Sequence, residues 1–381
     1  MKRNPLFLAV IAAAAAAAAL PASAAQVNVY GRIDSGLVYH NYGGDSTKEN
    51  TLSLDSGANT ASRIGIQGSE DLTSDTKVIF RLESRFTSDT GAYNAYSGKT
   101  NRIFGGQSTV GVVDKTWGEV TLGRVAGISS STGPYDLQFF MDAFGGGTVG
   151  AGNAPLKSSR HDNMVTYRSP WLAGFQATAQ YSMKSDANDE GDENKSSSNR
   201  FFDAGLHYKS GQFHAVAVYE QLFWGNNSTL DAGASKDRKL VTLGGSYRFE
   251  PATVFLQAQY YDGLKTVDSF ASNAYSATKS YKDGRIEGYG VYVGTELWFG
   301  ADSWKWMAYW RDYDLKTTAG QSYSGNTIGI ATKYVFRPSK TVEVYAGGGF
   351  SRCDRLGLEG GKAKTFTDQD VNVYTGITKY F

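Results

Sequence analysis

The chain is poor in the residues that build several common kinds of functional site. It holds one cysteine, Cys353, together with four histidines and seven prolines among its 381 residues. A single cysteine excludes an internal disulfide. The histidines stand in no HExxH or clustered Cys/His spacing and in no nucleophile motif, so we expect no metal site, no cofactor and no catalytic residue.

An excess of charge of one sign is also missing. Lys and Arg number 38 against 37 Asp and Glu. A chain so close to neutral gives no reason to propose nucleic acid as a partner, and we therefore expect none.

Only one long apolar run is present, from Leu6 to Leu20. Lys2 and Arg3 precede it, and Pro21 and the small residues Ala22-Ser23-Ala24 follow it. This order is typical of a secretory signal peptide, so we expect residues 1–24 to be cleaved and residues 25–381 to form one domain. A retained membrane anchor is the alternative, but the run is short for a membrane-spanning helix.

The residues that are abundant favour strands and turns: 24 Tyr, 20 Phe and 45 Gly. From Val27 to Tyr39 the odd positions are mainly apolar, whereas the even positions include Arg32, Asp34 and His40. Such a period of two gives a strand one face suited to lipid and one face suited to water.

Sixteen strand-like runs with this character follow one another along the chain. They are centred near Ile33, Ile64, Leu82, Val110, Val120, Val165, Ala179, Leu206, Ala217, Leu243, Ala258, Val291, Ala308, Ile330, Val344 and Tyr374. Single-chain bacterial outer-membrane barrels have an even number of antiparallel strands. The pattern predicts an all-β fold, a 16-stranded antiparallel transmembrane β-barrel in contact with outer-membrane lipid.

The links between these runs alternate in length. Short links such as "SGQ", "EPA", "GADS" and "RPSK" alternate with long polar ones such as "KSDANDEGDENKSSSNR". Short periplasmic turns opposite longer outer loops are typical of outer-membrane barrels. The last residue, Phe381, suits the aromatic girdle of such a barrel.

Several motifs carry a family resemblance over almost all of the chain after residue 24. They are "VNVYGRIDSGL", "SRIGIQGSEDL", "WGEVTLGR", "FGGG", "RHDNMVTYRSP" and the terminal phenylalanine. The chain resembles the general porins of Gram-negative bacteria, and most of all their β-proteobacterial branch. The resemblance implies a homotrimer, passive diffusion of small hydrophilic solutes and ions, and a third loop folded into the lumen.

The third long loop, between Arg124 and Arg160, carries an unusual cluster of apolar residues. Phe139, Phe140, Met141 and Phe144 would anchor it to the barrel wall, and Gly145-Gly146-Gly147 would let it turn sharply. The resemblance places this loop at the pore constriction, where its acidic residues would be Asp136 and Asp142. An outward loop whose aromatic residues pack on a neighbouring subunit is the alternative.

A basic wall is predicted to face this loop. The arginines on polar strand faces are Arg32, Arg63, Arg81, Arg85, Arg160 and Arg168. The resemblance assigns Arg32, Arg63 and Arg160 to the family's constriction, whereas the other three rest on strand parity alone. Structural ion pairs with Glu83, Asp34 or Asp162 are the alternative for each of them.

The balance of these charges predicts a mild preference for anions. An acidic residue common in the family just before "FGG" is replaced here by Ala143, and rings of Arg or Lys favour anions. Three other readings stay open: a substrate-specific channel, a barrel enzyme, and an adhesin with a plugged lumen. A sugar-selective path would use aromatic residues, but Trp304, Trp306 and Trp310 share a parity opposite to Lys305, which favours the lipid face.

Overall fold

The computed structural model describes residues 26–43, 49–93, 102–145, 155–186, 191–225, 237–264, 284–317, 322–359 and 362–381. Residues 1–25 and the segments between these ranges, which include Gly146 and Gly147, lie outside the described part. The predicted signal peptide therefore lies outside it as well.

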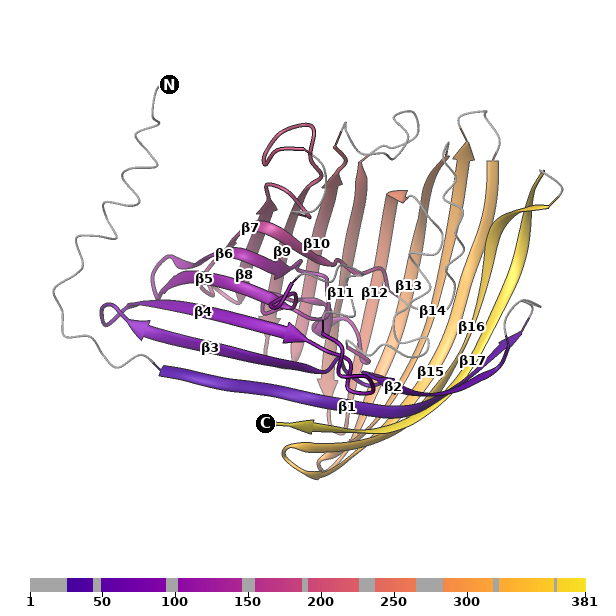
Figure 1. Ribbon diagram of the computed structural model, residues 1–381, viewed down its shortest axis with the longest axis horizontal. Helices are drawn as coiled ribbons and strands as arrows, with labels where there is room; N and C mark the ends of the chain where they lie inside the picture. Colours follow the sequence, from indigo (N-terminus) through magenta and orange to yellow (C-terminus); the bar gives the residue numbers. More distant parts are fainter. Residues whose placement is uncertain are drawn as a thin grey trace.

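The described chain is almost entirely β-strand (Figure 1). Its elements are β1 (Gln26–Gly43), β2 (Thr51–Ser56), β3 (Arg63–Asp71), β4 (Thr76–Arg85), β5 (Gln107–Asp114), β6 (Gly118–Ala126), the 3₁₀ turn η1 (Gln138–Phe140), β7 (Arg160–Arg168), β8 (Phe175–Ser182), β9 (Arg200–Ser210), β10 (Phe213–Phe223), β11 (Arg238–Phe249), β12 (Ala252–Leu264), β13 (Gly284–Phe299), β14 (Asp302–Thr317), β15 (Ser322–Ser339), β16 (Val342–Glu359) and β17 (Lys362–Tyr380). Among the described residues, no helix is long and apolar enough to cross a membrane.

These strands form a closed antiparallel barrel, which confirms the predicted fold. From β3 to β17 each strand pairs with the next, and β1 pairs with β17 to close the sheet. The segments β2 and β3 pair with two halves of β1, so together they make one interrupted strand of a 16-stranded barrel. The sequence pattern located the β3 half but not the β2 half or the break between them.

The two faces of the wall follow the predicted parity. Val27, Val29, Ile33 and Leu37 of β1 are exposed, whereas Asp34 is fully buried. Apolar side chains therefore cover the outside of the barrel, where lipid is the surrounding solvent, and polar side chains line the inside.

The barrel wall is uneven in height. Strands β3 to β8 have 8 to 10 residues each, whereas β13 to β17 have 16 to 19. The short turns of one end include residues 72–75, 115–117 and 169–174, between β3 and β4, β5 and β6, and β7 and β8. Figure 1 shows the early strands crossing at a steep angle to the long C-terminal ones.

Candidate functional site

Two buried carboxylates of the barrel wall bind the first residues of the loop between β6 and β7. Asp203 on β9 accepts a hydrogen bond from the Ile128 backbone N–H at 2.7 Å. Glu220 on β10 accepts one from the Ser129 hydroxyl. The Ser129 hydroxyl also accepts the Ser158 N–H at 3.2 Å, so both ends of the loop are tied to the same place on the inner wall.

The middle of the loop packs on the inner face of β10. Ile128, Leu137 and Met141 form a buried cluster with Val216 and Val218. These two valines share the inward parity of Glu220, at a place where the lumen face of a barrel would otherwise be polar. Their apolar character is explained by the loop that covers them.

Phe140, at the end of η1, packs against a pair of histidines. Its ring lies 4.2 Å from that of His207 and 4.7 Å from that of His214, between ring centroids. The two imidazoles are joined by a 2.8 Å hydrogen bond between His207 Nε2 and His214 Nδ1. Both histidines therefore serve as packing partners of the loop.

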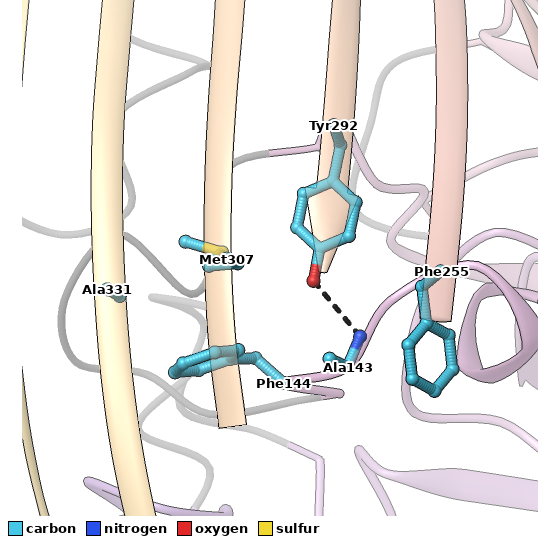
Figure 2. Close-up of a cluster of buried hydrophobic side chains, with 6 residues drawn as sticks. All are labelled: Ala143, Phe144, Phe255, Tyr292, Met307 and Ala331. Atoms are coloured by element: carbon cyan, nitrogen blue, oxygen red, sulfur yellow. Dashed lines mark hydrogen bonds between the residues drawn. The ribbon is translucent and has the colours of Figure 1, made fainter. Parts of the chain in front are cut away.

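The tip of the loop reaches the far side of the barrel. Ala143 and Phe144 pack against inward-facing side chains of four strands, namely Phe255 (β12), Tyr292 (β13), Met307 (β14) and Ala331 (β15) (Figure 2). The Ala143 N–H donates to the Tyr292 hydroxyl at 3.0 Å. Gly145 follows with φ of +65°, a left-handed conformation that favours glycine. The third loop therefore folds inward, as predicted.

The predicted loop anchors divide into two kinds. Phe140, Met141 and Phe144 pack into the wall, and Phe144 is only 5% exposed. Phe139 is 50% exposed and lies beside Gly145 instead of against the barrel wall. Phe139 is thus not an anchor, because η1 turns its side chain away from the wall that receives Phe140.

Both acidic residues of the loop are buried. Asp142 accepts hydrogen bonds from Tyr292 at 2.9 Å and from Lys157 at 3.0 Å, so a lysine of the same loop balances its charge. Asp136 accepts the Gln138 N–H at the start of η1 at 2.8 Å. Burial raises the pKa of the Asp136 carboxyl to about 7, against the lowering effect of hydrogen bonds from the backbone.

Arg32 and Arg63 are placed by the break between β2 and β3. Their Nε atoms both donate to the Ala61 carbonyl, at 3.1 Å and 3.4 Å. Glu83 on β4 then pairs with Arg63 at 3.2 Å and with Arg85 at 3.4 Å. Arg85 is itself buried.

Arg160 joins this group from the start of β7. Its Nε donates to the Gly106 carbonyl at 2.9 Å. A Cβ added at Gly106 would come within 2.6 Å of the Glu83 carboxylate. A larger residue at position 106 would therefore have to displace Glu83 from the arginines. Arg102 instead pairs with Asp162 and, at 2.7 Å, with Asp186.

A cavity of about 280 Å³, here called the tip cavity, lies beside the loop tip and is lined by the tip and by charged side chains of the barrel wall. Its charged lining residues are Arg32, Arg63, Lys305, Lys333, Arg337, Asp142, Glu296 and Glu343. Lys305, Lys333 and Arg337 are not among the residues predicted from the sequence, although the parity of Lys305, opposite to that of the three tryptophans, indicates an inward side chain. Lys333 donates to Asn59 at 2.8 Å and lies over the Phe144 ring.

A family model described as Gram-negative porin matches residues 9–356. The chain belongs to the Gram-negative porin family.

Individual relatives agree with this assignment. An outer membrane porin protein of Bordetella pertussis is 30% identical over 87% of this chain and 91% of its own length. Outer membrane porin protein 32 of Delftia acidovorans is 29% identical over 65% of this chain and 66% of its own. The fold matches an anion-selective porin from Comamonas acidovorans at a TM-score of 0.69 and 22% identity, over 94% of this chain and 100% of that one.

The porin therefore resides in the outer membrane and forms a channel for solutes. These findings confirm the family, the location and the channel function expected from the motifs.

Of the six predicted arginines of the porin, Arg32 and Arg63 line the tip cavity, whereas Arg85 and Arg160 lie near Glu83 and the other two lie elsewhere. Arg81 donates to the Gln67 side-chain oxygen at 3.0 Å through Nε, and Arg168 pairs with Glu119 at 2.6 Å. Both line another cavity, nearer the short turns.

The three tryptophans of β14 lie on the outer face of the porin. Trp304, Trp306 and Trp310 are all exposed, and the rings of the first two lie 5.0 Å apart. Lys305 points to the opposite face and lines the tip cavity. Among the described residues, no three His, Cys, Asp or Glu side chains gather in a way that could hold a metal ion.

Proposed function

We propose that this porin is a homotrimeric general diffusion channel with a mild preference for anions. Its constriction would lie at the tip cavity, between the loop residues Phe140 to Gly145 and the basic wall. Arg32 and Arg63 would face the passing ion, and Arg85 and Arg160 would hold the shared Glu83 beside them. Among the predicted loop residues, Gly146 lies outside the described part of the chain. Asp136 would stabilise the conformation of the loop.

The charge of the tip cavity carries this proposal. Five of its lining residues are basic and three are acidic, an excess of two positive charges. Each of the acids is engaged by a cation: Asp142 by Lys157, Glu296 by Lys305 at 3.1 Å, and Glu343 by Arg337 at 2.9 Å. An excess of fixed cations favours anions. The similar fold of the anion-selective porin from Comamonas acidovorans agrees with this preference.

The reversal potential in a potassium chloride gradient tests the selectivity. The purified porin in a planar bilayer should give a potential of the anion-selective sign, and Arg63→Gln should move it toward the cation side. A cation-selective sign for the unmodified protein would overturn the proposal.

The trimer rests on the family and on a solved trimer form of Vibrio cholerae OmpT with a similar fold, at a TM-score of 0.61 and 14% identity. Migration on a detergent gel before and after heating should show a species of about three chains that heat converts to one. Migration of the unheated protein at the size of one chain would contradict it.

The rival functions have less support. A sugar-selective path would need aromatic residues along the lumen, but the tryptophans of β14 lie outside. An enzyme would need a nucleophile beside a base. His207 and His214 instead pack against the third loop, between β6 and β7, here called loop 3. A plugged adhesin would conduct no ions, so a measurement of single-channel conductance on the purified protein separates it from the channel.

The proposed mature porin begins near residue 25. Determination of the N-terminal sequence of protein extracted from outer membranes would check this, with cleavage expected after Ala24 or Ala25.

A further inference from the structure

The second cavity, here called the turn-side cavity, lies on the inner wall of β1 and β3 to β7. It encloses about 380 Å³. Most of its lining residues, including Lys77, Arg81 and Gln107, have inward parity on their strands. Arg81 stands four residues nearer the short turns than Arg85, which is about 13 Å along a strand.

The charge of this cavity is unbalanced toward the positive. Its charged lining residues are Lys77, Arg81, Arg168 and Glu119. Glu119 has both oxygens engaged, one by the Tyr135 hydroxyl at 2.6 Å and the other by Arg168 at 2.6 Å. Three cations and one occupied carboxylate leave an excess of two positive charges.

Arg81 is held in place by neutral groups. Its Nε and one terminal nitrogen donate to the Gln67 side-chain oxygen, and its guanidinium carbon lies 5.0 Å from the centre of the Tyr30 ring. Within the described ranges, none of the ion pairs found involves Arg81 or Lys77. A guanidinium that is fixed by an amide and an aromatic ring, with its charge still unmatched, is ready to bind an oxyanion.

The rest of the lining is half apolar. Ile79, Val113, Pro134 and the ring of Tyr135 contribute to the wall, and Gln26 and Asn28 supply amides. The volume lies in the range of pockets that hold small organic ligands, well above the needs of a bare inorganic ion. This combination suits a molecule with an anionic head and a small organic body.

We propose that the turn-side cavity is a binding site for small organic phosphates such as a sugar phosphate. Arg81 and Lys77 bind the phosphate, and the apolar wall and amides contact the organic part. The site lies on the side of the short turns, which face the periplasm in outer-membrane barrels. It is separate from the tip cavity and does not depend on the anion preference proposed above.

The test uses the full-length porin in a planar bilayer, with glucose 6-phosphate added to one side at a time. We expect saturable reduction of the chloride current that is stronger from the short-turn side. Arg81→Gln should raise the half-blocking concentration by about tenfold. This is the loss expected for one charge-assisted contact of about 1.4 kcal/mol.

Lys77→Gln provides a second variant, because Lys77 is exposed and its removal leaves no buried partner behind. This variant should raise the half-blocking concentration by about threefold, as expected for the loss of an exposed charge. Arg63→Gln is the matched control at the tip cavity and should leave the half-blocking concentration within about twofold.

Three results would overturn the site. The first is a half-blocking concentration that is unchanged in both Arg81→Gln and Lys77→Gln. The second is loss of block in Arg63→Gln alone. Equal block by uncharged glucose would show that the phosphate is not recognised. A cation-selective reversal potential would contradict the proposed anion preference but would leave this site standing.

Discussion

Asp203 and Glu220 are direct cross-strand partners in β9 and β10, and both carboxylates hold the root of loop 3. Asp203 is fully buried and Glu220 is 1% exposed. Like charges directly opposite each other in a sheet are unfavourable. Hydrogen bonds from Ile128 and Ser129, and Arg238 at 3.7 Å from Glu220, offset this cost. The position of the loop therefore depends on this pair.

Removal of one member should loosen the loop. Glu220→Ala deprives the Ser129 hydroxyl and Arg238 of a buried partner, a cost of about 1–3 kcal/mol. We expect more frequent fluctuations in single-channel current. Glu220→Gln keeps an oxygen acceptor for Ser129 and should resemble the unmodified porin more closely. Equal fluctuation in both variants would show that the hydrogen bond does not hold the loop.

The tip of the loop should respond to loss of its apolar anchor. Phe144→Ala removes a ring that is 5% exposed among Phe255, Tyr292 and Met307, and Phe to Ala changes in packed cores cost about 3–5 kcal/mol. A higher and noisier conductance is expected. Phe139→Ala is the matched control, because that ring is half exposed and surface changes are usually within about 0.5 kcal/mol. A quiet Phe144→Ala channel would argue against the anchor.

Lys305 and Glu296 are cross-strand partners at the tip cavity and form an ion pair at 3.1 Å. Lys305→Gln should move the reversal potential toward cations, and Glu296→Gln should move it toward anions. A unit charge at a few Å in water changes the energy of an ion by about 1 kcal/mol, so each shift in permeability ratio should stay below about fivefold. The double variant should return near the starting value. Shifts of the same sign in both single variants would refute this account.

The pH dependence of the loop should follow Asp136. Burial raises the pKa of this carboxyl to about 7, above its value in an unfolded chain, so the folded loop binds more protons. The resulting stability is fully present at low pH and falls by a few kcal/mol at most as pH rises from about 4 to about 7. We expect current fluctuations to increase between about pH 4 and about pH 7 and to level off above that.

Asp136→Asn provides the control for this dependence. The amide cannot ionise, but its oxygen can still accept the Gln138 N–H, so the fluctuations should lose most of their pH dependence. Lys157 and Asp142 are charged groups that act on Asp136, and neither is altered by this change. A pH response that persists in Asp136→Asn would assign it to another group.

Strand parity predicted much of the wall and part of the site. It placed Arg32, Arg63 and Arg85 on the inner face, because side chains of a strand alternate strictly. It did not show that Arg81 and Arg168 line a different cavity, since parity says which face a residue takes but not its height in the barrel. Lys333 and Arg337 were missed because they lie far along the chain from loop 3.

The class of the protein, most of its strands and the lipid-facing side of each can be predicted from the chain alone, because they depend on a local period of two and on turn residues. Which side chains meet inside the barrel is visible only in the folded molecule. The tip of loop 3 contacts β12 to β15, which lie on the far side of the closed barrel. The break between β2 and β3 supplies the Ala61 carbonyl that positions Arg32 and Arg63. Contacts between residues separated by half the barrel depend on the closure of the barrel, so no local pattern in the chain records them.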